Sequence, residues 1–194
     1  MNKRLIQKRK TRKLILKTAK NIFITNGFIN TTTVEVAKKA SIAHGTLFLH
    51  FKTKDILILE IFDEILENIN NEIQQIIVKT GKLEEILARY LDLIQQQESF
   101  FSVIARELPF YSPELRRKIL FRDSIIRSYF HKIISKGIET GIYRKVDVSS
   151  AVTYLFGAIN YYLSFKTIYI TEGSVIGKFK DSIIKTFIQL LVCD

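Results

Sequence analysis

Residues 40–55 read ASIAHGTLFLHFKTKD, and this stretch decides the fold of the first part of the chain. Ser41-Ile42-Ala43 is too short for anything but a tight turn, and His44 to Phe51 spans about two helical turns. Upstream, Thr32-Thr33-Val34-Glu35 is a capping-box pattern that predicts a helix up to about Ala40. A helix, a three-residue turn and a second helix have the spacing of a helix-turn-helix.

Helical signals continue on both sides of this motif. A basic arm at residues 2–13 leads into a helix that Asn26-Gly27 ends, and Thr53 is placed to cap a long helix from about Lys54 to Ile77. The chain has only two prolines and eight glycines, which favours an all-α protein. Four more helices are predicted, at about 81–97, 114–139, 148–169 and 174–192.

The composition is that of a globular protein, with 47% hydrophobic and 25% charged residues in a chain of 194. A single cysteine, Cys193, excludes an intramolecular disulfide and a thiolate metal cluster, so a reducing cytoplasm is the expected compartment. The first 20 residues lack a secretory signal pattern. The uncharged run Val148 to Phe165 contains five polar side chains, which suits a buried helix better than a membrane span.

The net charge of +11 is unevenly distributed. Residues 1–54 hold 13 Lys and Arg against the single acid Glu35, a net of +12, whereas residues 55–194 hold 17 against 18, a net of −1. Such asymmetry indicates a polyanion partner for the first segment, either nucleic acid or an anionic membrane surface.

Metal binding and catalysis explain the opening stretch poorly. His44 and His50 are six residues apart, which separates them by about 240° around a helix, so the pair cannot chelate one ion. A catalytic pair also needs an orienting third group and a cleft, and the chain contains no GxSxG, P-loop or dinucleotide fingerprint. We therefore expect no enzyme, no metal and no cofactor.

Nucleic-acid binding accounts for more of the residues at once. Leu47 and Phe51, four residues apart, are expected to pack inward and to leave the other side chains on the outer face. Thr46 can offer a hydroxyl or a methyl group to a base, and Lys54 in the first turn of its helix is explained if a phosphate lies there. Considered alone, His44 or His50 is more often a solvated surface residue than a contact. Their combination with the basic segment favours DNA.

At this point a family resemblance is clear. The run from Ile15 to Leu59 resembles the DNA-binding domain of the tetracycline-repressor (TetR) family and covers about a quarter of the chain. The matching landmarks are Ala19, Phe23, Gly27-Phe28, Thr32-Thr33, Val36-Ala37, Ala40, Gly45-Thr46-Leu47, His50-Phe51 and Lys54.

The resemblance implies a homodimer with a three-helix DNA-binding domain, here residues 1–53, and a helical-bundle domain for effector binding and dimerisation, here residues 54–194. The positions implied to face DNA are Thr33, Ala43, His44, Gly45, Thr46, Phe48, Leu49, His50 and Lys54. Two positions depart from the family pattern. Ser41 replaces a usual glycine, which predicts strain in the turn, and Phe48 replaces a tyrosine whose hydroxyl commonly touches phosphate.

The larger domain carries weaker signals. Aromatic and apolar residues in the middle of the chain either line an effector pocket or fill a core; the pocket candidates are Phe100, Ile104, Phe121, Ile125 and Phe156. The stripe on the helix at about 148–169 either forms a dimer interface or belongs to a monomer core; the interface candidates are Tyr154, Ala158, Tyr161, Tyr162 and Phe165.

The resulting expectation is a cytoplasmic transcriptional regulator that binds double-stranded operator DNA as a homodimer, most simply a repressor. A small, apolar molecule would release it from a pseudo-palindromic operator, with the long helix from Lys54 as the hinge. One alternative is a DNA-binding regulator that needs no ligand and is controlled by a protein partner. Another is a protein that uses its basic arm to bind a membrane surface.

Overall fold

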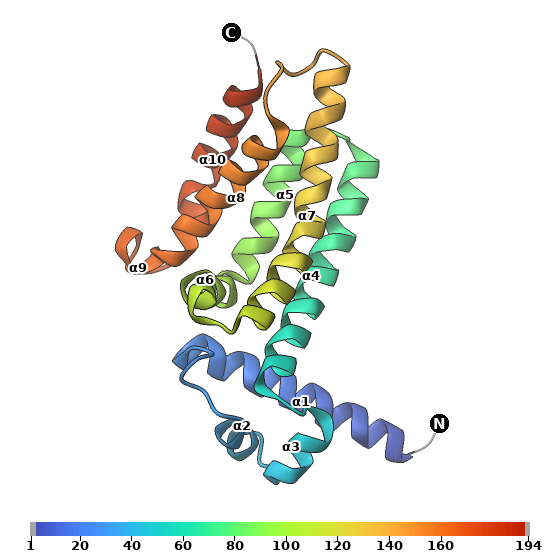
Figure 1. Cartoon of the computed structure of the whole chain (residues 1–194), viewed down its shortest axis with the longest axis vertical. Helices are drawn as coiled ribbons and strands as arrows, with labels where there is room; N and C mark the ends of the chain where they lie inside the picture. The colour runs from blue at the N-terminus through green and yellow to red at the C-terminus, as the bar shows by residue number, and fades with distance from the viewer. Residues whose placement is uncertain (1–2, 193–194) are drawn as a thin grey trace. The chain divides into compact units, whose positions relative to one another are not determined.

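The computed structural model describes residues 3–192 (Figure 1). This part of the chain forms helices and no β-strand, which confirms the predicted all-α fold. The helices are α1 (Lys3–Asn26), α2 (Thr33–Lys39), α3 (His44–His50), α4 (Lys54–Lys79), α5 (Leu83–Gln96), α6 (Glu98–Glu107), the 3-10 turn η1 (Leu108–Phe110), α7 (Pro113–Glu139), α8 (Val148–Ser164), α9 (Lys166–Tyr169) and α10 (Val175–Leu191).

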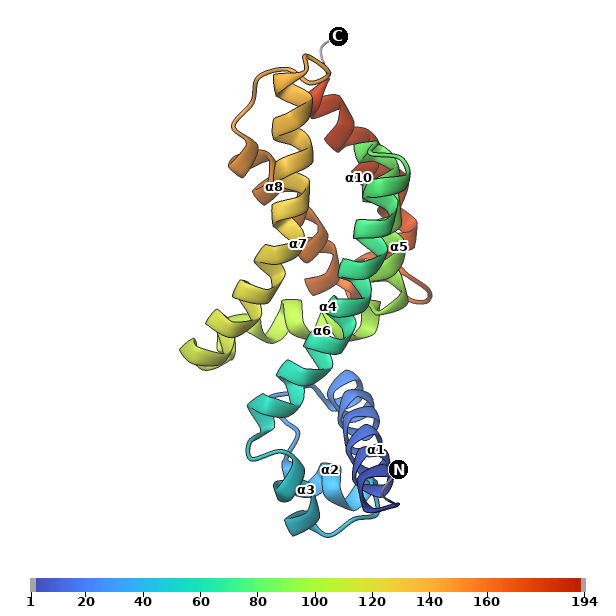
Figure 2. The ribbon, with the colours of Figure 1, turned by 90° about the vertical axis from the view of Figure 1, so that its right-hand side faces the viewer.

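The helices group into two packing units. The first contains the residues up to Ile65 together with Glu107–Ile119, and the second contains Leu66–Arg106 together with the residues from Leu120 onward. The first unit thus includes the first turns of α4 and the segment Glu107–Ile119 besides the helix-turn-helix, and the domain boundary between residues 53 and 54 stays a prediction. Figure 2 shows α1, α2 and α3 grouped around the start of α4.

The predicted helix ends are largely formed. Thr32 Oγ1 accepts a hydrogen bond from Glu35 N at 3.1 Å, and Thr53 Oγ1 accepts one from Ile56 N at 3.2 Å. The capping box at Thr32 is only half formed, because the Glu35 carboxylate accepts instead from Asn26 Nδ2 at 2.9 Å. Each cap satisfies an amide that the helix itself leaves without a partner.

Three elements differ from the expectation. The basic arm is helical from Lys3, so α1 is longer than its apolar pattern indicated. α6 was not predicted. The helix expected to end near Tyr169 ends at Ser164, and the chain turns at Phe165 so that the Tyr169 ring packs on Tyr162 with centroids 5.3 Å apart. Within residues 3–192, no helix is both long enough and apolar enough to cross a membrane.

Each unit has its own aromatic core. In the first, Phe28 lies edge-on to Phe23 and to Tyr111, with ring centroids 5.2 and 5.0 Å away. In the second, the Tyr90, Phe130 and Phe156 rings pack on one another at 5.4 to 5.5 Å. Edge-to-face packing at these distances adds to the stabilisation from burial.

A buried carboxylate ties two helices of the second unit together. Glu98, at the start of α6, accepts from Val175 N at 3.1 Å and Ile176 N at 3.0 Å, and Lys166 Nζ lies 2.8 Å from it. Burial acts to raise the pKa of Glu98, but the hydrogen bonds from Lys166, Ser174 and the two amides hold that pKa below its usual value. The carboxylate thus caps the first turn of α10.

The turn between α2 and α3 stores backbone strain at Ser41. Its φ is +54°, the left-handed region, and Ile42 N donates to Ala37 O at 3.1 Å, the hydrogen bond typical of a helix end with a left-handed residue. A side chain with a Cβ costs about 1–2 kcal/mol in this conformation, which glycine avoids. The strain predicted for this position is confirmed.

Replacing Ser41 by Gly is therefore expected to raise the free energy of unfolding by about 1 kcal/mol, since it removes the Cβ clash. For a chain of this size, that corresponds to an increase in Tm of about 2–4 °C. Urea unfolding and a thermal melt both measure it. Ser41→Ala is the control: it also removes the hydroxyl but keeps the Cβ, so an equal gain in that variant would contradict the assignment of the strain to φ.

Candidate nucleic-acid interface

Helix α3 presents one buried and several exposed side chains. Leu47 is fully buried, whereas Leu49 is 76% exposed and His44 and Gly45 lie on the surface. A Cβ built onto Gly45 meets no atom within 4 Å, so the fold itself does not require glycine there. Ala43, also exposed, occupies the N-cap position without a side-chain cap. The outer face of α3 is thus open to a partner, with its backbone accessible near the start of the helix.

The starts of α2 and α3 meet through two predicted site residues. Thr33 Oγ1 and His44 Nε2 lie 3.0 Å apart, within hydrogen-bond distance. Which group donates depends on the imidazole tautomer. The structure therefore brings Thr33 and His44 together on one exposed surface. The contact also restricts the orientation of the His44 imidazole.

Phe48 and Lys52 form a second exposed pair at the other end of α3. The Lys52 ammonium lies 4.6 Å from the centroid of the Phe48 ring, and the ring is 48% exposed. This contact holds a cation beside the position at which the tyrosine hydroxyl is missing. Lys52 was not among the predicted site residues, although its position directly after the helix-turn-helix was a signal for it.

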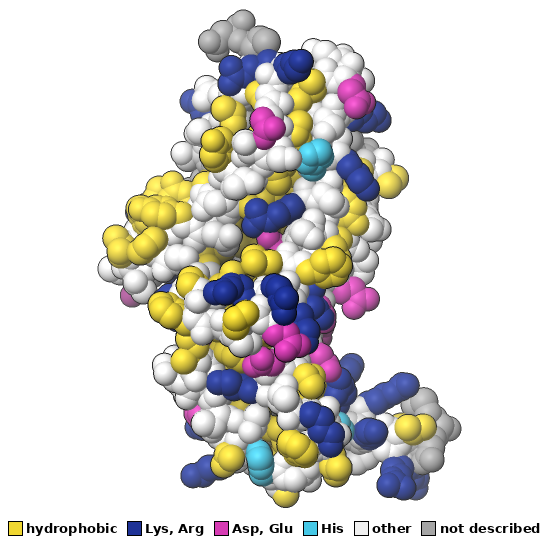
Figure 3. Space-filling view, in the orientation of Figure 1, with side chains coloured by type: hydrophobic (Ala, Val, Ile, Leu, Met, Phe, Trp, Pro, Cys, Tyr) yellow, Lys and Arg dark blue, Asp and Glu magenta, His cyan; other side chains and the backbone are white. Residues whose placement is uncertain are grey.

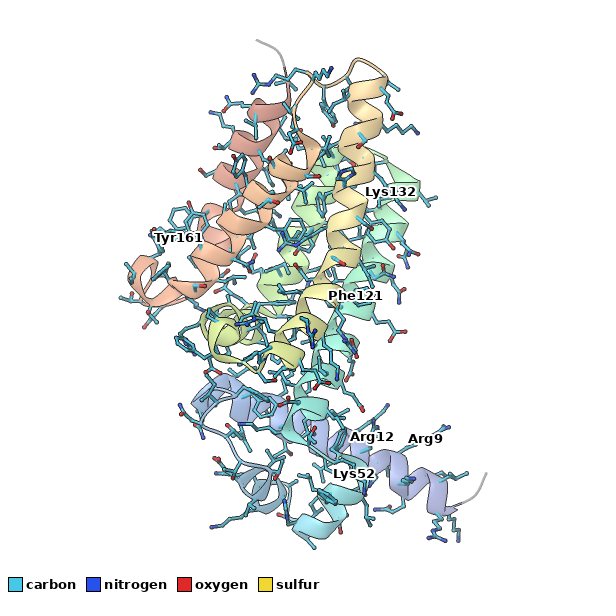
Figure 4. All side chains as sticks on the ribbon, in the orientation of Figure 1. Arg9, Arg12, Lys52, Phe121, Lys132 and Tyr161 are labelled. Carbon is cyan, nitrogen blue, oxygen red and sulfur yellow. The ribbon has the colours of Figure 1, made fainter. Side chains whose placement is uncertain are left out.

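His50 lies beside basic groups of α1. The Arg12 guanidinium donates to His50 O at 3.2 Å, and Figure 4 places Arg9, Arg12 and Lys52 in this region. Burial, followed by the charges of Arg12 and Lys8, lowers the pKa of the His50 imidazole. A nearby phosphate would act in the opposite direction. Arg12 itself is paired with Glu60 and lies 4.3 Å above the Phe51 ring, so it serves the fold.

Lys54 makes contacts within the chain that were not predicted. Its ammonium donates to three carbonyl oxygens of the loop between α1 and α2, Phe28 O at 2.7 Å, Ile29 O at 3.1 Å and Thr31 O at 2.8 Å. It also lies 4.4 Å from the centroid of the Phe28 ring. Burial lowers the pKa of this ammonium, while the Asp55 and Glu107 carboxylates act to raise it. All three ammonium protons are thus engaged within the chain, which does not favour the predicted phosphate contact.

Glu107 holds the same loop from its other side. Its Oε2 accepts from Phe28 N at 2.9 Å and from Ile29 N at 3.1 Å, and its side chain is 8% exposed. Gly27 has φ +83°, and a Cβ there would lie 2.1 Å from Glu107 Oε1. Sequence reasoning missed Glu107 because its partners are 78 and 79 residues away along the chain.

The predicted effector residues differ in exposure. Phe100, Ile104 and Phe156 are buried, whereas Phe121 is 70% and Ile125 is 47% exposed on α7. Beside Phe156 lies a polar pair: Arg127 Nε donates to Asp123 Oδ2 at 2.5 Å, and the guanidinium lies 4.3 Å from the Phe156 ring centroid. Burial raises the pKa of Asp123 even though Arg127 opposes that shift. A polar pair against an apolar interior is a feature of many ligand sites.

The predicted dimerisation residues lie on the surface of the second unit. Tyr154, Tyr161 and Phe165 are 67%, 51% and 44% exposed, Ala158 is exposed, and Tyr162 is half-buried. Figure 3 shows hydrophobic side chains over the end of α8, where Figure 4 labels Tyr161. A groove of about 540 Å³ between α8 and α10 includes Tyr154, Ala158 and Tyr162 in its lining. The exposure of these rings does not favour the monomer-core expectation, and the dimer interface stays a prediction.

Two family models match the chain. Residues 15–61 match the model described as bacterial regulatory proteins, tetR family, and residues 79–164 match the model described as tetracyclin repressor-like, C-terminal domain. These segments of 47 and 86 residues cover 133 of the 194 residues. The matches thus include both α3 and most of the second packing unit.

Individual relatives agree with the models. The chain is 28% identical to the fatty acid metabolism regulator protein of Bacillus subtilis over 162 residues, which cover 79% of this chain and 82% of the relative. It is 26% identical to the HTH-type transcriptional regulator QacR of Staphylococcus aureus over 156 residues, 78% and 83% of the two chains. The crystal structure of FadR from Bacillus subtilis in complex with stearoyl-CoA superposes with a TM-score of 0.79 at 22% identity, over 90% of this chain and 96% of that one.

Lys54 and Lys52 are expected to differ when each is replaced by methionine. Lys54→Met keeps the apolar stem but leaves three carbonyls without their donor, so the free energy of unfolding should fall by about 1–2 kcal/mol with little change in the salt dependence of DNA binding. Lys52→Met should leave stability unchanged and reduce the slope of log K against log salt by about 0.9 for each chain bound. Urea unfolding and fluorescence anisotropy at four salt concentrations measure both quantities. The reverse pattern would restore Lys54 as the phosphate contact.

Proposed function

The chain belongs to the tetR family of bacterial regulatory proteins, and from this premise we propose that it is a repressor that a small molecule releases from a pseudo-palindromic operator. It is a DNA-binding transcriptional regulator and not an enzyme. The observation that supports the proposal is the exposed face of α3. The buried Leu47 anchors the opposite face of this helix in the core, and the contact between Thr33 and His44 links its start to α2. Since its partner is genomic DNA, we place it in the bacterial cytoplasm.

The residues of this face divide between base reading and phosphate binding. His44, Ala43, Gly45 and Thr46 occupy the leading end of α3, which enters the major groove first in a helix-turn-helix. Of these, His44 and Thr46 carry groups that can hydrogen-bond to a base edge. Phosphates are bound by Thr33, beside the leading end of α3, and by His50 and Lys52 at its other end; Leu49 makes apolar contact with the groove.

The effector is proposed to be an amphiphile with a long apolar tail and an anionic head, such as a long-chain acyl-CoA. A relative named for fatty acid metabolism and a similar fold solved with stearoyl-CoA support this class. In this chain the tail would lie among buried apolar side chains that include Phe100, Ile104 and Phe156, and the Arg127 guanidinium lies 4.3 Å from the centroid of the Phe156 ring. The exposed Phe121 and Ile125 on α7 would then lie at the entrance rather than in the interior.

The working form is proposed to be a homodimer joined along α8 and α10. The groove between these helices and the exposed rings of Tyr154, Tyr161 and Phe165 offer an apolar face, and Ala158 with the adjacent Gly157 permits close approach of a second copy. A dimer places two α3 helices on two half-sites, which explains why the operator should be pseudo-palindromic.

His44 and Thr46 are expected to govern which operator is preferred. In a selection of bound DNA from a random library, His44→Ala and Thr46→Ala should each relax the preference at the base pair that the side chain reads, with a loss of about 1–3 kcal/mol on the preferred operator and little loss on other DNA. Lys52→Ala should weaken binding to all sequences alike. Identical losses by the three variants on every DNA would contradict this division of roles.

Stearoyl-CoA is expected to release the operator. Addition to the protein–DNA complex should lower operator affinity by a factor of about 5 to 150, the usual range of coupling between two sites, and should raise the Tm of the free protein. Coenzyme A alone, which lacks the tail, is the matched control and should do neither. If acyl-CoAs of every chain length leave both the Tm and the DNA complex unchanged, the proposed effector class is wrong. The alternative hypothesis, a regulator controlled by a protein partner, would then be favoured.

A further inference from the structure

The first half of α1 is a strongly basic helix that precedes the part of the chain matched by the DNA-binding family model. That match begins at residue 15, whereas α1 begins at Lys3. Residues 3–13 contain seven Lys and Arg and no acid. In Figure 3 the dark-blue side chains gather over this end of α1 without magenta ones among them. We call residues 3–13 the basic extension.

The helical form of the basic extension is unfavourable by itself. Its first turn contains cations, which oppose the helix dipole by about 0.3–1 kcal/mol each. Lys8 and Arg12, like Arg9 and Lys13, are like charges four residues apart on one face of the helix, and such pairs destabilise a helix. In the described part of the chain, no salt bridge neutralises Lys8, Arg9, Lys10 or Lys13. An anionic partner would remove both costs.

The contacts of Arg12 indicate where an anionic partner would bind. Its guanidinium donates to His50 O at 3.2 Å, pairs with Glu60 and stacks on the Phe51 ring, so it fixes the basic extension next to the C-terminal end of α3. Lys8 is close enough to His50 to lower the pKa of its imidazole. The helical rise of 1.5 Å per residue gives about 14 Å from Lys3 to Arg12, the axial length of about four base pairs.

We propose that the basic extension binds the phosphates of the duplex that flanks each half-site, as a continuation of the surface formed by α3. The inference rests on the proposed DNA-binding function and extends its footprint. Lys8, Arg9 and Lys13 are the contact residues, all exposed, while Arg12 holds the helix in place. The contacts carry affinity and no sequence preference, because they are made to phosphate alone.

Duplex DNA fits this surface better than a membrane does. A helix that lies on a bilayer needs a continuous apolar face, rich in Leu, Phe or Trp, opposite its cations. The basic extension has only Leu5 and Ile6 as apolar residues, adjacent in sequence, and Leu5 is 54% exposed. The side chains of the basic extension are therefore suited to binding a polyanion through charge alone.

The test compares the wild-type chain with the variant Lys8→Ala/Arg9→Ala/Lys13→Ala on the selected operator. Alanine favours helix, so the variant should keep its fold, which circular dichroism checks. The slope of log K against log salt should fall by about 0.9 for each phosphate that is no longer neutralised, roughly 3 per bound chain if all three residues bind phosphate. The control Lys132→Ala/Lys136→Ala/Lys145→Ala removes the same charge from exposed positions of the second unit and should leave the slope unchanged (Figure 4).

A second measurement varies the DNA in place of the protein. Trimming the duplex to the edges of the operator should weaken binding by the wild type by roughly tenfold or more at low salt and leave the triple variant almost unaffected. Equal slopes and equal length dependence for the two proteins, with a specific operator still selected, would overturn this inference and leave the proposed function intact. Failure of the wild type to select any DNA would overturn both. Loss of binding to phosphatidylglycerol vesicles in the variant, with DNA binding unchanged, would assign the basic extension to membranes.

Discussion

The short loop between α1 and α2 is held from both sides, and the recognition surface depends on this. Its amides at Phe28 and Ile29 donate to the Glu107 carboxylate, and its carbonyls at Phe28, Ile29 and Thr31 accept from the Lys54 ammonium. A buried amide or carbonyl without a partner costs about 1–3 kcal/mol, and four of these five hydrogen bonds are buried or part-buried, so the two charged side chains fix the loop firmly. Because the loop leads directly into α2, its position sets where α2 and α3 lie.

The basic residues of the first packing unit have two distinct roles. Lys54 and Arg12 make contacts within the chain. The Lys54 ammonium donates to backbone carbonyls and lies over the Phe28 ring, and the Arg12 guanidinium pairs with Glu60 and lies over the Phe51 ring. Lys52, beside the Phe48 ring, and Lys8, Arg9 and Lys13 of α1 lie exposed and give the surface its positive character. A net charge of +12 over the first 54 residues therefore overstates the number of residues available to a polyanion.

Helix α6 runs from the second packing unit into the first, and each of its two end residues, Glu98 and Glu107, is a buried glutamate. Glu98 caps the start of α10 in the second unit, and Glu107 holds the loop between α1 and α2 in the first. α4 also passes from one unit to the other, beginning at Lys54. Both helices thus run from one unit into the other and hold the loop, α6 through Glu107 and α4 through Lys54.

The sequence by itself determined the all-α fold, the helix-turn-helix and its caps, because capping, apolar periodicity and turn length are local properties that residues such as Thr32, Thr53 and Leu47 express within one or two turns. It also placed the strain at Ser41. The tertiary structure alone decided which side chains were free to bind a partner. The sequence predicted Lys54 as a phosphate contact, whereas in the structure its ammonium donates hydrogen bonds to three carbonyl oxygens. No sequence pattern indicated the role of Glu107, because its partners lie 78 and 79 residues away along the chain. Hydrogen bonds between segments far apart in the chain produce no periodic pattern in the sequence. They nevertheless determine which charged side chains are engaged within the protein and which are exposed to a partner.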